Sequence, residues 1–190
     1  SGWGLFVGVI AFSTALGGLF SLLCAYAWGR VGKLSARATA ALLAGACFVA
    51  VYVVPFLKYP ANPPSIGNAD TIGTRTQLYF GMIVISVVAM VASLNLGRSL
   101  ARRLGIWNAA IAGGATYLGL VIIAAVLMPA VNEVPEAFPA TLLWSFRTSA
   151  LVMQLILWAG LGLLFGELTQ RSLTANLTAS SRVIATPARR

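Results

Sequence analysis

The sequence predicts an all-α integral membrane protein, a bundle of five transmembrane helices, because of its composition and the placement of its charges. Charged residues make up 9% of the 190 residues, against roughly 25% in soluble domains, and hydrophobic residues make up 59%. So few charges exclude an ordinary soluble surface, and this hydrophobicity excludes intrinsic disorder. The 13 Lys and Arg and the 4 Asp and Glu also leave five long segments without any charge.

Each of the five charge-free segments is long enough to cross a bilayer. A hydrocarbon core of about 30 Å needs about 20 apolar residues of helix. A helix satisfies its own backbone hydrogen bonds in lipid, and the segments lack the alternation of barrel strands. The predicted spans are residues 4–28, 39–57, 77–96, 109–128 and 148–166. They place the transmembrane domain at residues 1–168.

The flanks of the spans support each element in turn. The first span is too long for a cleaved signal peptide and has no basic region before it. The connection at 55–70 contains several prolines, so we expect an extended and stiff loop. In the connection at 128–147, Pro139 is well placed as an early residue of the fifth helix. Residues 169–190, rich in Ser, Thr, Ala and Arg, predict a flexible basic tail.

The basic residues of the connections predict the orientation, because Lys and Arg concentrate on the cytoplasmic side. Ten of them fall in the first connection, the third connection and the tail: Arg30, Lys33, Arg37, Arg98, Arg102, Arg103, Arg171, Arg182, Arg189 and Arg190. The second and fourth connections carry Lys58, Arg75 and Arg147. We therefore expect the N-terminus outside and the C-terminus in the cytoplasm. The high pI of about 10.6 then reflects topology and does not indicate a nucleic-acid partner.

Two glycine pairs with a spacing of four residues predict close helix contacts, since small residues let helix backbones approach each other in lipid. They are Gly4 with Gly8 in the first span and Gly162 with Gly166 in the fifth. We expect these two helices to pack closely inside the bundle. A dimer interface is the alternative use of the same glycines.

The two longest connections carry unusual motifs. They read PFLKYPANPP at 55–64, TIGTRT at 71–76 followed by Tyr79, EVPEAFP at 133–139 and LWSFR at 143–147. These motifs resemble the signature of the CbtA family of predicted cobalt transporter subunits. The resemblance implies a multi-pass protein of the bacterial inner membrane that transports cobalt or a related divalent ion. It also implies a small partner subunit, CbtB.

Members of that family have one more N-terminal helix than the five predicted here. The resemblance therefore implies six helices in the intact chain, with both ends in the cytoplasm. We expect the first helix to be missing from this chain, which opens without an initiator Met.

The resemblance directs attention to possible ligands for a metal ion. The chain has no His, and the carboxylates of the outer connections are Asp70, Glu133 and Glu136. They could form a cation-binding mouth, since carboxylates suit hard divalent ions. Alternatively they form ion pairs that order the loops, matched three against three by Lys58, Arg75 and Arg147. A softer path would use sulfur ligands inside the spans: Cys24, Cys47, Met82, Met90 and Met153.

An enzyme is not expected. Without His there is no Ser-His pair and no His-ligated metal or haem, and no phosphate-binding loop of the GxxxxGK[ST] type occurs. We expect no bound cofactor, only a transported Co²⁺. Two hypotheses remain: a metal-ion transporter subunit, or a non-catalytic accessory subunit of a larger respiratory or photosynthetic complex. The resemblance favours the first. The absence of charge inside the spans favours the second, because ion pathways usually contain intramembrane ionisable residues.

Overall fold

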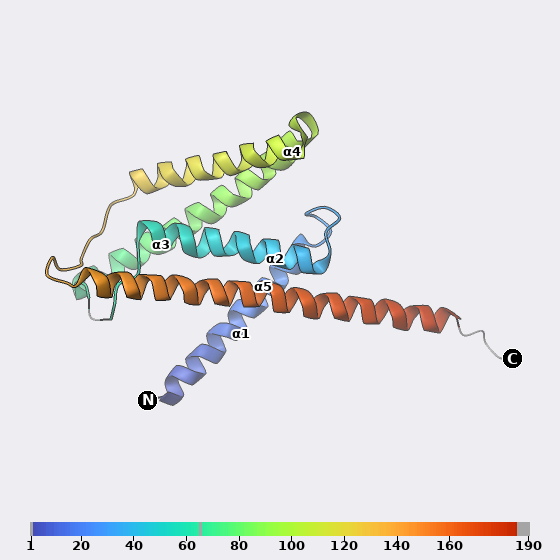
Figure 1. The fold of residues 1–190 in the computed structure, drawn as a ribbon, viewed down its shortest axis with the longest axis horizontal. Helices are drawn as coiled ribbons and strands as arrows, with labels where there is room; N and C mark the ends of the chain where they lie inside the picture. The colour runs from blue at the N-terminus through green and yellow to red at the C-terminus, as the bar shows by residue number, and fades with distance from the viewer. Residues whose placement is uncertain (1, 65, 186–190) are drawn as a thin grey trace. The chain divides into compact units, whose positions relative to one another are not determined.

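A computed structural model describes residues 2–64 and 66–185, and all regular structure within these ranges is helical (Figure 1). The elements are α1 (Gly2–Ala27), α2 (Ala36–Cys47), the π-helix η1 (Phe48–Val53), α3 (Val54–Lys58), the 3-10 turn η2 (Ala69–Thr71), α4 (Ile72–Leu127) and α5 (Ala140–Ala185). The predicted all-α class is confirmed for the described residues.

Four continuous helical stretches are long and apolar enough to cross a membrane. They are Gly2–Ala27, Ala36–Lys58, Ile72–Leu127 and Ala140–Thr178. The second stretch joins α2, η1 and α3 without a break. Large apolar side chains of α1 lie exposed along its length, and Trp3 is 79% exposed. Such surfaces are expected where the surrounding solvent is lipid.

Helix α4 reverses direction at Gly105. This glycine has φ 78° and ψ 161°, a left-handed backbone that residues with a Cβ rarely adopt. The two arms of α4, residues 72–104 and 106–127, then run in opposite directions beside each other (Figure 1, green and yellow). A Cβ added to Gly113 would lie 3.1 Å from the backbone oxygen of Ser93 and 3.6 Å from the Cα of Gly97. The arms therefore make a helical hairpin whose backbones touch through glycine.

A hydroxyl pair holds the hairpin together further along. The Ser86 and Tyr117 side chains hydrogen-bond at 2.8 Å between the two arms, and Ser86 is fully buried. The surrounding core contains Val54, Met82 and Ala89. Because lipid supplies no partner for a hydroxyl, pairing the two groups with each other avoids the cost of an unsatisfied polar atom.

A π-helix precedes Pro55 because proline disrupts the α-helical hydrogen bonds. Pro55 has no N–H to donate to the fourth residue before it, and its ring crowds that residue's carbonyl. The helix widens instead, and the Val54 N–H bonds to the Val49 oxygen five residues earlier. The aromatic rings at 48, 52 and 56 then stack in a row, with centroids 6.2 Å and 5.3 Å apart.

The chain divides into two compact units, Ser1–Gly45 with Leu157–Arg190, and Ala46–Ile156. In the first unit α5 packs against α2 through the predicted glycines. A Cβ on Gly162 would lie 2.6 Å from the Cβ of Ala44, and one on Gly166 would lie 3.0 Å from the Cα of Arg37. Small residues of α2, Ala40 and Ala44, therefore complete this contact.

The first helix does not contact the last through Gly4 and Gly8, although the sequence predicts this contact. Gly4 and Gly8 are exposed, and a Cβ on Gly8 would meet no atom within 4 Å. Helix α1 meets α5 near its other end, where the Phe20 and Phe165 rings pack edge to face at 5.6 Å. The physical reason is that α2 presents alanines at the required spacing, so the α5 glycines pack there.

The predicted flexible tail is helical as far as it is described. Helix α5 continues to Ala185, since no glycine or proline interrupts residues 167–185. Arg171 bonds to Glu167 one turn earlier, with Nε 2.6 Å from Oε1, which supports the helix locally. Residues 186–190 lie outside the described part.

We predict that Gly166→Leu destabilises the protein by about 1–3 kcal/mol, because the larger side chain has no room against α2. Thermal unfolding of the detergent-solubilised protein measures the effect. Gly8→Leu is the matched control and leaves the unfolding temperature unchanged, since its site is open. Equal damage from both changes would show that Gly8 also needs close packing.

Candidate functional site

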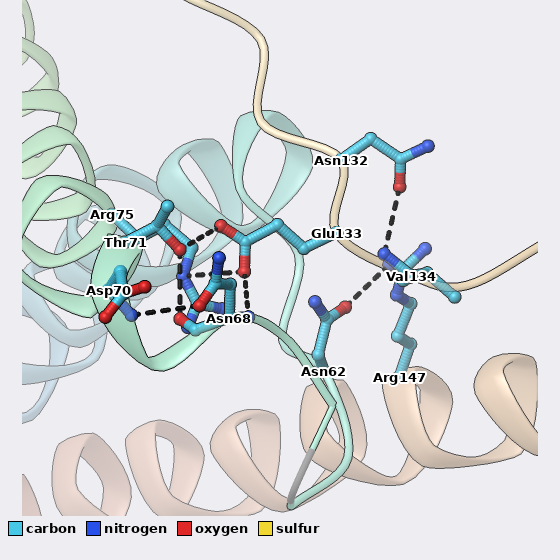
Figure 2. Close-up of polar contacts among 9 residues, drawn as sticks. All are labelled: Asn62, Asn68, Asp70, Thr71, Arg75, Asn132, Glu133, Val134 and Arg147. Atoms are coloured by element: carbon cyan, nitrogen blue, oxygen red, sulfur yellow. Dashed lines mark hydrogen bonds and ion pairs between the residues drawn. The ribbon is translucent and has the colours of Figure 1, made fainter.

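Glu133 connects the segment after α4 to the residues that begin α4. Its Oε1 accepts a hydrogen bond from the Thr71 hydroxyl, and its Oε2 accepts one from the Asn68 backbone N–H at 3.0 Å (Figure 2). The Arg75 Nε lies 3.2 Å from the same Oε2. The side chain of Glu133 is only 14% exposed, so one carboxylate fixes two loop segments that are far apart in sequence.

Gly67 makes this approach possible. Its φ is +119°, and an added Cβ would lie 2.8 Å both from an Arg75 nitrogen, Nη1, and from the Glu133 Oε2. Any other residue would be strained in its backbone and would collide with the ion pair. Sequence reasoning did not identify this glycine, although its position among the loop prolines was a signal of a tight turn.

Arg147 holds the α3–α4 loop by a different set of contacts. Its Nε donates to the Ala61 backbone oxygen at 3.2 Å and its Nη2 donates to the Asn62 Oδ1 at 3.0 Å. The Lys58 ammonium lies 5.8 Å from the centroid of the Tyr59 ring. Among the described residues, Arg75–Glu133 is thus the one ion pair formed by the three predicted basic residues.

The predicted ion pairs of Arg147 and Lys58 with the outer carboxylates are therefore wrong for the described residues. A guanidinium binds carbonyl and amide oxygens as well as carboxylates, and the loop brings those oxygens closer.

The remaining carboxylates do not gather around Glu133. Asp70 and Glu136 are exposed and form no ion pair within the described part of the chain. No group of three or more His, Cys, Asp or Glu among the described residues could hold a metal ion. The geometry therefore favours a loop-ordering role for Glu133. Metal binding by Asp70, Glu133 and Glu136 stays a prediction.

A pocket of about 510 Å³ lies beside Glu133 in the second unit, and we call it the loop pocket. Its aromatic lining comes from the second helical stretch, the following loop and the first arm of α4: Tyr52, Phe56, Tyr59, Tyr79 and Phe80. Its charged lining is Arg75, Glu133 and Arg147. The Tyr59 hydroxyl donates to the Pro129 oxygen at 2.8 Å and so ties the two loops beside the pocket. Sequence reasoning missed this pocket, for which the spacing of aromatic residues at 48, 52 and 56 was the available signal.

A second cavity, of about 650 Å³, opens in the first unit around Glu167. This carboxylate lies 2.5 Å from the Arg37 Nε and 2.6 Å from the Arg171 Nε. Gln170 accepts a hydrogen bond from the Ala36 N–H at 3.2 Å, which joins α5 to the start of α2. Glu167 and Arg171 are one helical turn apart, so their pairing follows from the sequence, whereas Arg37 is an additional partner that sequence reasoning did not identify.

Hydrogen bonding lowers the pKa of Glu133. The Thr71 hydroxyl contributes most and the Asn68 N–H next; partial burial opposes them, and the charge of Arg75 lowers the pKa further. A carboxyl whose folded pKa is depressed stabilises the fold above its ordinary pKa, about 4.3. That stabilisation is lost as the pH falls through the depressed value.

We predict that Glu133→Gln lowers the unfolding temperature at pH 7, and that the difference from the unchanged protein shrinks once the pH falls below about 4.3 and is lost as the pH passes through the depressed pKa of Glu133. Unfolding of the detergent-solubilised protein as a function of pH measures it. Glu136→Gln is the matched control, because Glu136 is exposed and forms no ion pair among the described residues. A difference for Glu133→Gln that stays constant with pH would contradict the assigned role of its charge.

Comparison with known proteins agrees with the motifs of the two loops. The chain matches no curated protein and no solved structure. The family model of CbtA, described as a probable cobalt transporter subunit, matches residues 1–170. This range includes the loop pocket, all of the first three membrane-length helices and most of the fourth. The chain therefore belongs to the CbtA family.

Proposed function

We propose that this protein is the membrane-embedded subunit of a transporter for cobalt or a related divalent metal ion, in a bacterial inner membrane. The observation that carries the proposal is the family match over residues 1–170, on a chain with four helices of membrane-spanning length. The sequence contains no nucleotide-binding loop of the GxxxxGK[ST] type. A second subunit, of the small CbtB type, fits the description of the family as a transporter subunit.

We further propose five spans, with each arm of α4 crossing the membrane once. Residues 72–104 and 106–127 each exceed the length that about 30 Å of hydrocarbon requires. Arg98, Arg102 and Arg103 precede the reversal at Gly105, and this cluster favours a cytoplasmic position for it. The loop pocket then faces outside, and the N-terminus does too.

We predict that a cysteine at the α4 reversal reacts only from the inside. Ile106→Cys and Asn132→Cys are placed singly in a chain whose Cys24 and Cys47 are replaced by Ala. Both positions are exposed. A membrane-impermeant maleimide labels intact spheroplasts at 132, but labels 106 only after permeabilisation. Labelling of both positions in intact spheroplasts would refute the proposed crossing of the two arms.

An accessory role in a larger membrane complex is the second candidate. The apolar surface of α1 favours it, because the buried residues of this helix are confined to Phe20, Cys24 and Ala27. A surface of this kind can contact a partner helix as well as lipid. In this role the protein would order a complex and would move no ion.

Cobalt accumulation separates the two candidates. We predict that cells lacking the gene accumulate less cobalt, that the intact gene restores it, and that magnesium content does not change.

Asp70→Asn, Glu133→Gln and Glu136→Gln then test the carboxylates singly, with protein abundance measured in parallel. If Glu133 orders the loops, its variant is less abundant, whereas loss of uptake at full abundance indicates an ion-binding role. Unchanged cobalt, together with native purification alongside a stoichiometric large partner, would establish the accessory role instead.

A further inference from the structure

The charge of the loop pocket suits an anion better than a cation. Its lining has two cationic side chains, Arg75 and Arg147, against one carboxylate, Glu133. The oxygens of that carboxylate already accept hydrogen bonds from Thr71 and Asn68 and contact Arg75. A bare divalent ion would therefore meet like charge and find no free set of carboxylate ligands.

The two guanidinium groups still have donors for a ligand. A guanidinium carries five N–H donors. Within the described part of the chain, Arg147 uses Nε and Nη2 on the loop oxygens. Arg75 donates from Nη2 to the Asn68 oxygen at 3.4 Å, and its buried Nε lies 3.2 Å from the Glu133 carboxylate. Nη1 of each arginine and the second N–H of Arg75 Nη2 are therefore left as donors. Such groups bind carboxylates and phosphates in two-point contacts.

The walls of the pocket suit a flat ligand. Tyr52 and Phe56 stack at 5.3 Å along one side, on and beside the π-helix that Pro55 imposes. Tyr79 and Phe80 line it from α4. Aromatic rings bind other planar groups by stacking, and π-helices occur frequently at functional sites. The volume of about 510 Å³ falls in the range of small-molecule sites.

We propose that the loop pocket binds a carboxylate carried on a flat, unsaturated body, not a bare divalent cation. The ligand is either a free organic acid or the carboxylate chelate of a metal ion. In both forms the carboxylate contacts the guanidinium groups and the ring lies against the aromatic wall. The chelate form deepens the proposed transport function and rests on it, whereas binding of the free acid does not.

Pyridine-2-carboxylate tests the proposal, because it is planar, anionic at neutral pH and chelates Co²⁺. Calorimetry on the purified full chain in detergent compares this anion, its neutral amide, its preformed Co²⁺ complex and CoCl₂ alone. We expect the carboxylate to bind at least about tenfold more tightly than the amide, as a charge-assisted contact should. Tighter binding of the Co²⁺ complex than of the free acid identifies the chelate as the ligand, and the reverse order identifies the organic acid. Binding of CoCl₂ alone with greater affinity than either carboxylate form would overturn the proposal.

Matched variants connect the binding to the pocket. Arg147→Gln should weaken carboxylate binding about tenfold or more, whereas Arg103→Gln, at an exposed arginine outside the pocket, should leave it unchanged. Because Arg147 also holds the loop, Phe56→Leu provides a test that keeps both arginines, with the exposed Phe12→Leu as its control. Unchanged affinity in both Arg147→Gln and Phe56→Leu would overturn the proposal.

The binding proposal and the transport proposal can be refuted independently. Loss of carboxylate binding in the purified variants, with cobalt accumulation normal in cells that carry them, would overturn the chelate form and leave the proposed transport intact. Carboxylate binding by a protein whose deletion does not change cellular cobalt would overturn the transport function and support an organic-acid ligand.

Discussion

The structure depends first on the requirement that backbone groups within hydrocarbon find partners inside the protein. The long apolar segments meet this requirement as helices, and the two departures have identifiable causes. At Pro55 the missing N–H is accommodated by a π-helix, with Val54 bonding to Val49. At Gly105 the positive φ turns α4 back on itself. The π-helix at Pro55 carries the aromatic row, and the turn at Gly105 forms the helical hairpin.

Close helix contacts follow from the same environment. In lipid there is no hydrophobic driving force between apolar side chains, so helices associate where their backbones can touch and their polar groups can pair. Gly97 and Gly113 allow this inside α4, and Gly162 and Gly166 allow it between α5 and α2. The Ser86–Tyr117 hydrogen bond adds a polar contact to the first of these pairs. Small residues therefore determine where helices meet, and large apolar residues remain on the outside.

The loops of the second unit form an ordered frame and not a simple connection. Glu133 bonds to Thr71 and Asn68 across 62 and 65 residues of sequence. Arg147 bonds to Ala61 and Asn62 across 86 and 85 residues. These contacts use the one carboxylate that lines the loop pocket for structure. The rest of the lining includes the guanidinium groups of Arg75 and Arg147 and five aromatic rings. Glu133 therefore orders the loops, and metal binding by Asp70, Glu133 and Glu136 stays a prediction.

The sequence by itself determined the helical membrane class, the apolar segments that lie within the four membrane-length helices, and the family. These properties are local: charge depletion over about twenty residues is visible without knowing any neighbour. The Glu167–Arg171 pair was predictable for the same reason, since four residues on a helix are adjacent. The motifs of the two loops are also contiguous, so the family resemblance was readable from them.

Only the tertiary structure decided which groups meet. Arg147 could have bonded to any of several carboxylates or carbonyls, and its actual partner, the Ala61 oxygen, lies 86 residues away. The partner of Gly162 and Gly166 depended on the alanines of α2. The loop pocket depended on the joint placement of two loops and three helical stretches. Side-chain chemistry limits the possible partners, but long-range packing selects among them. For this reason the helices were predictable, whereas the site was not.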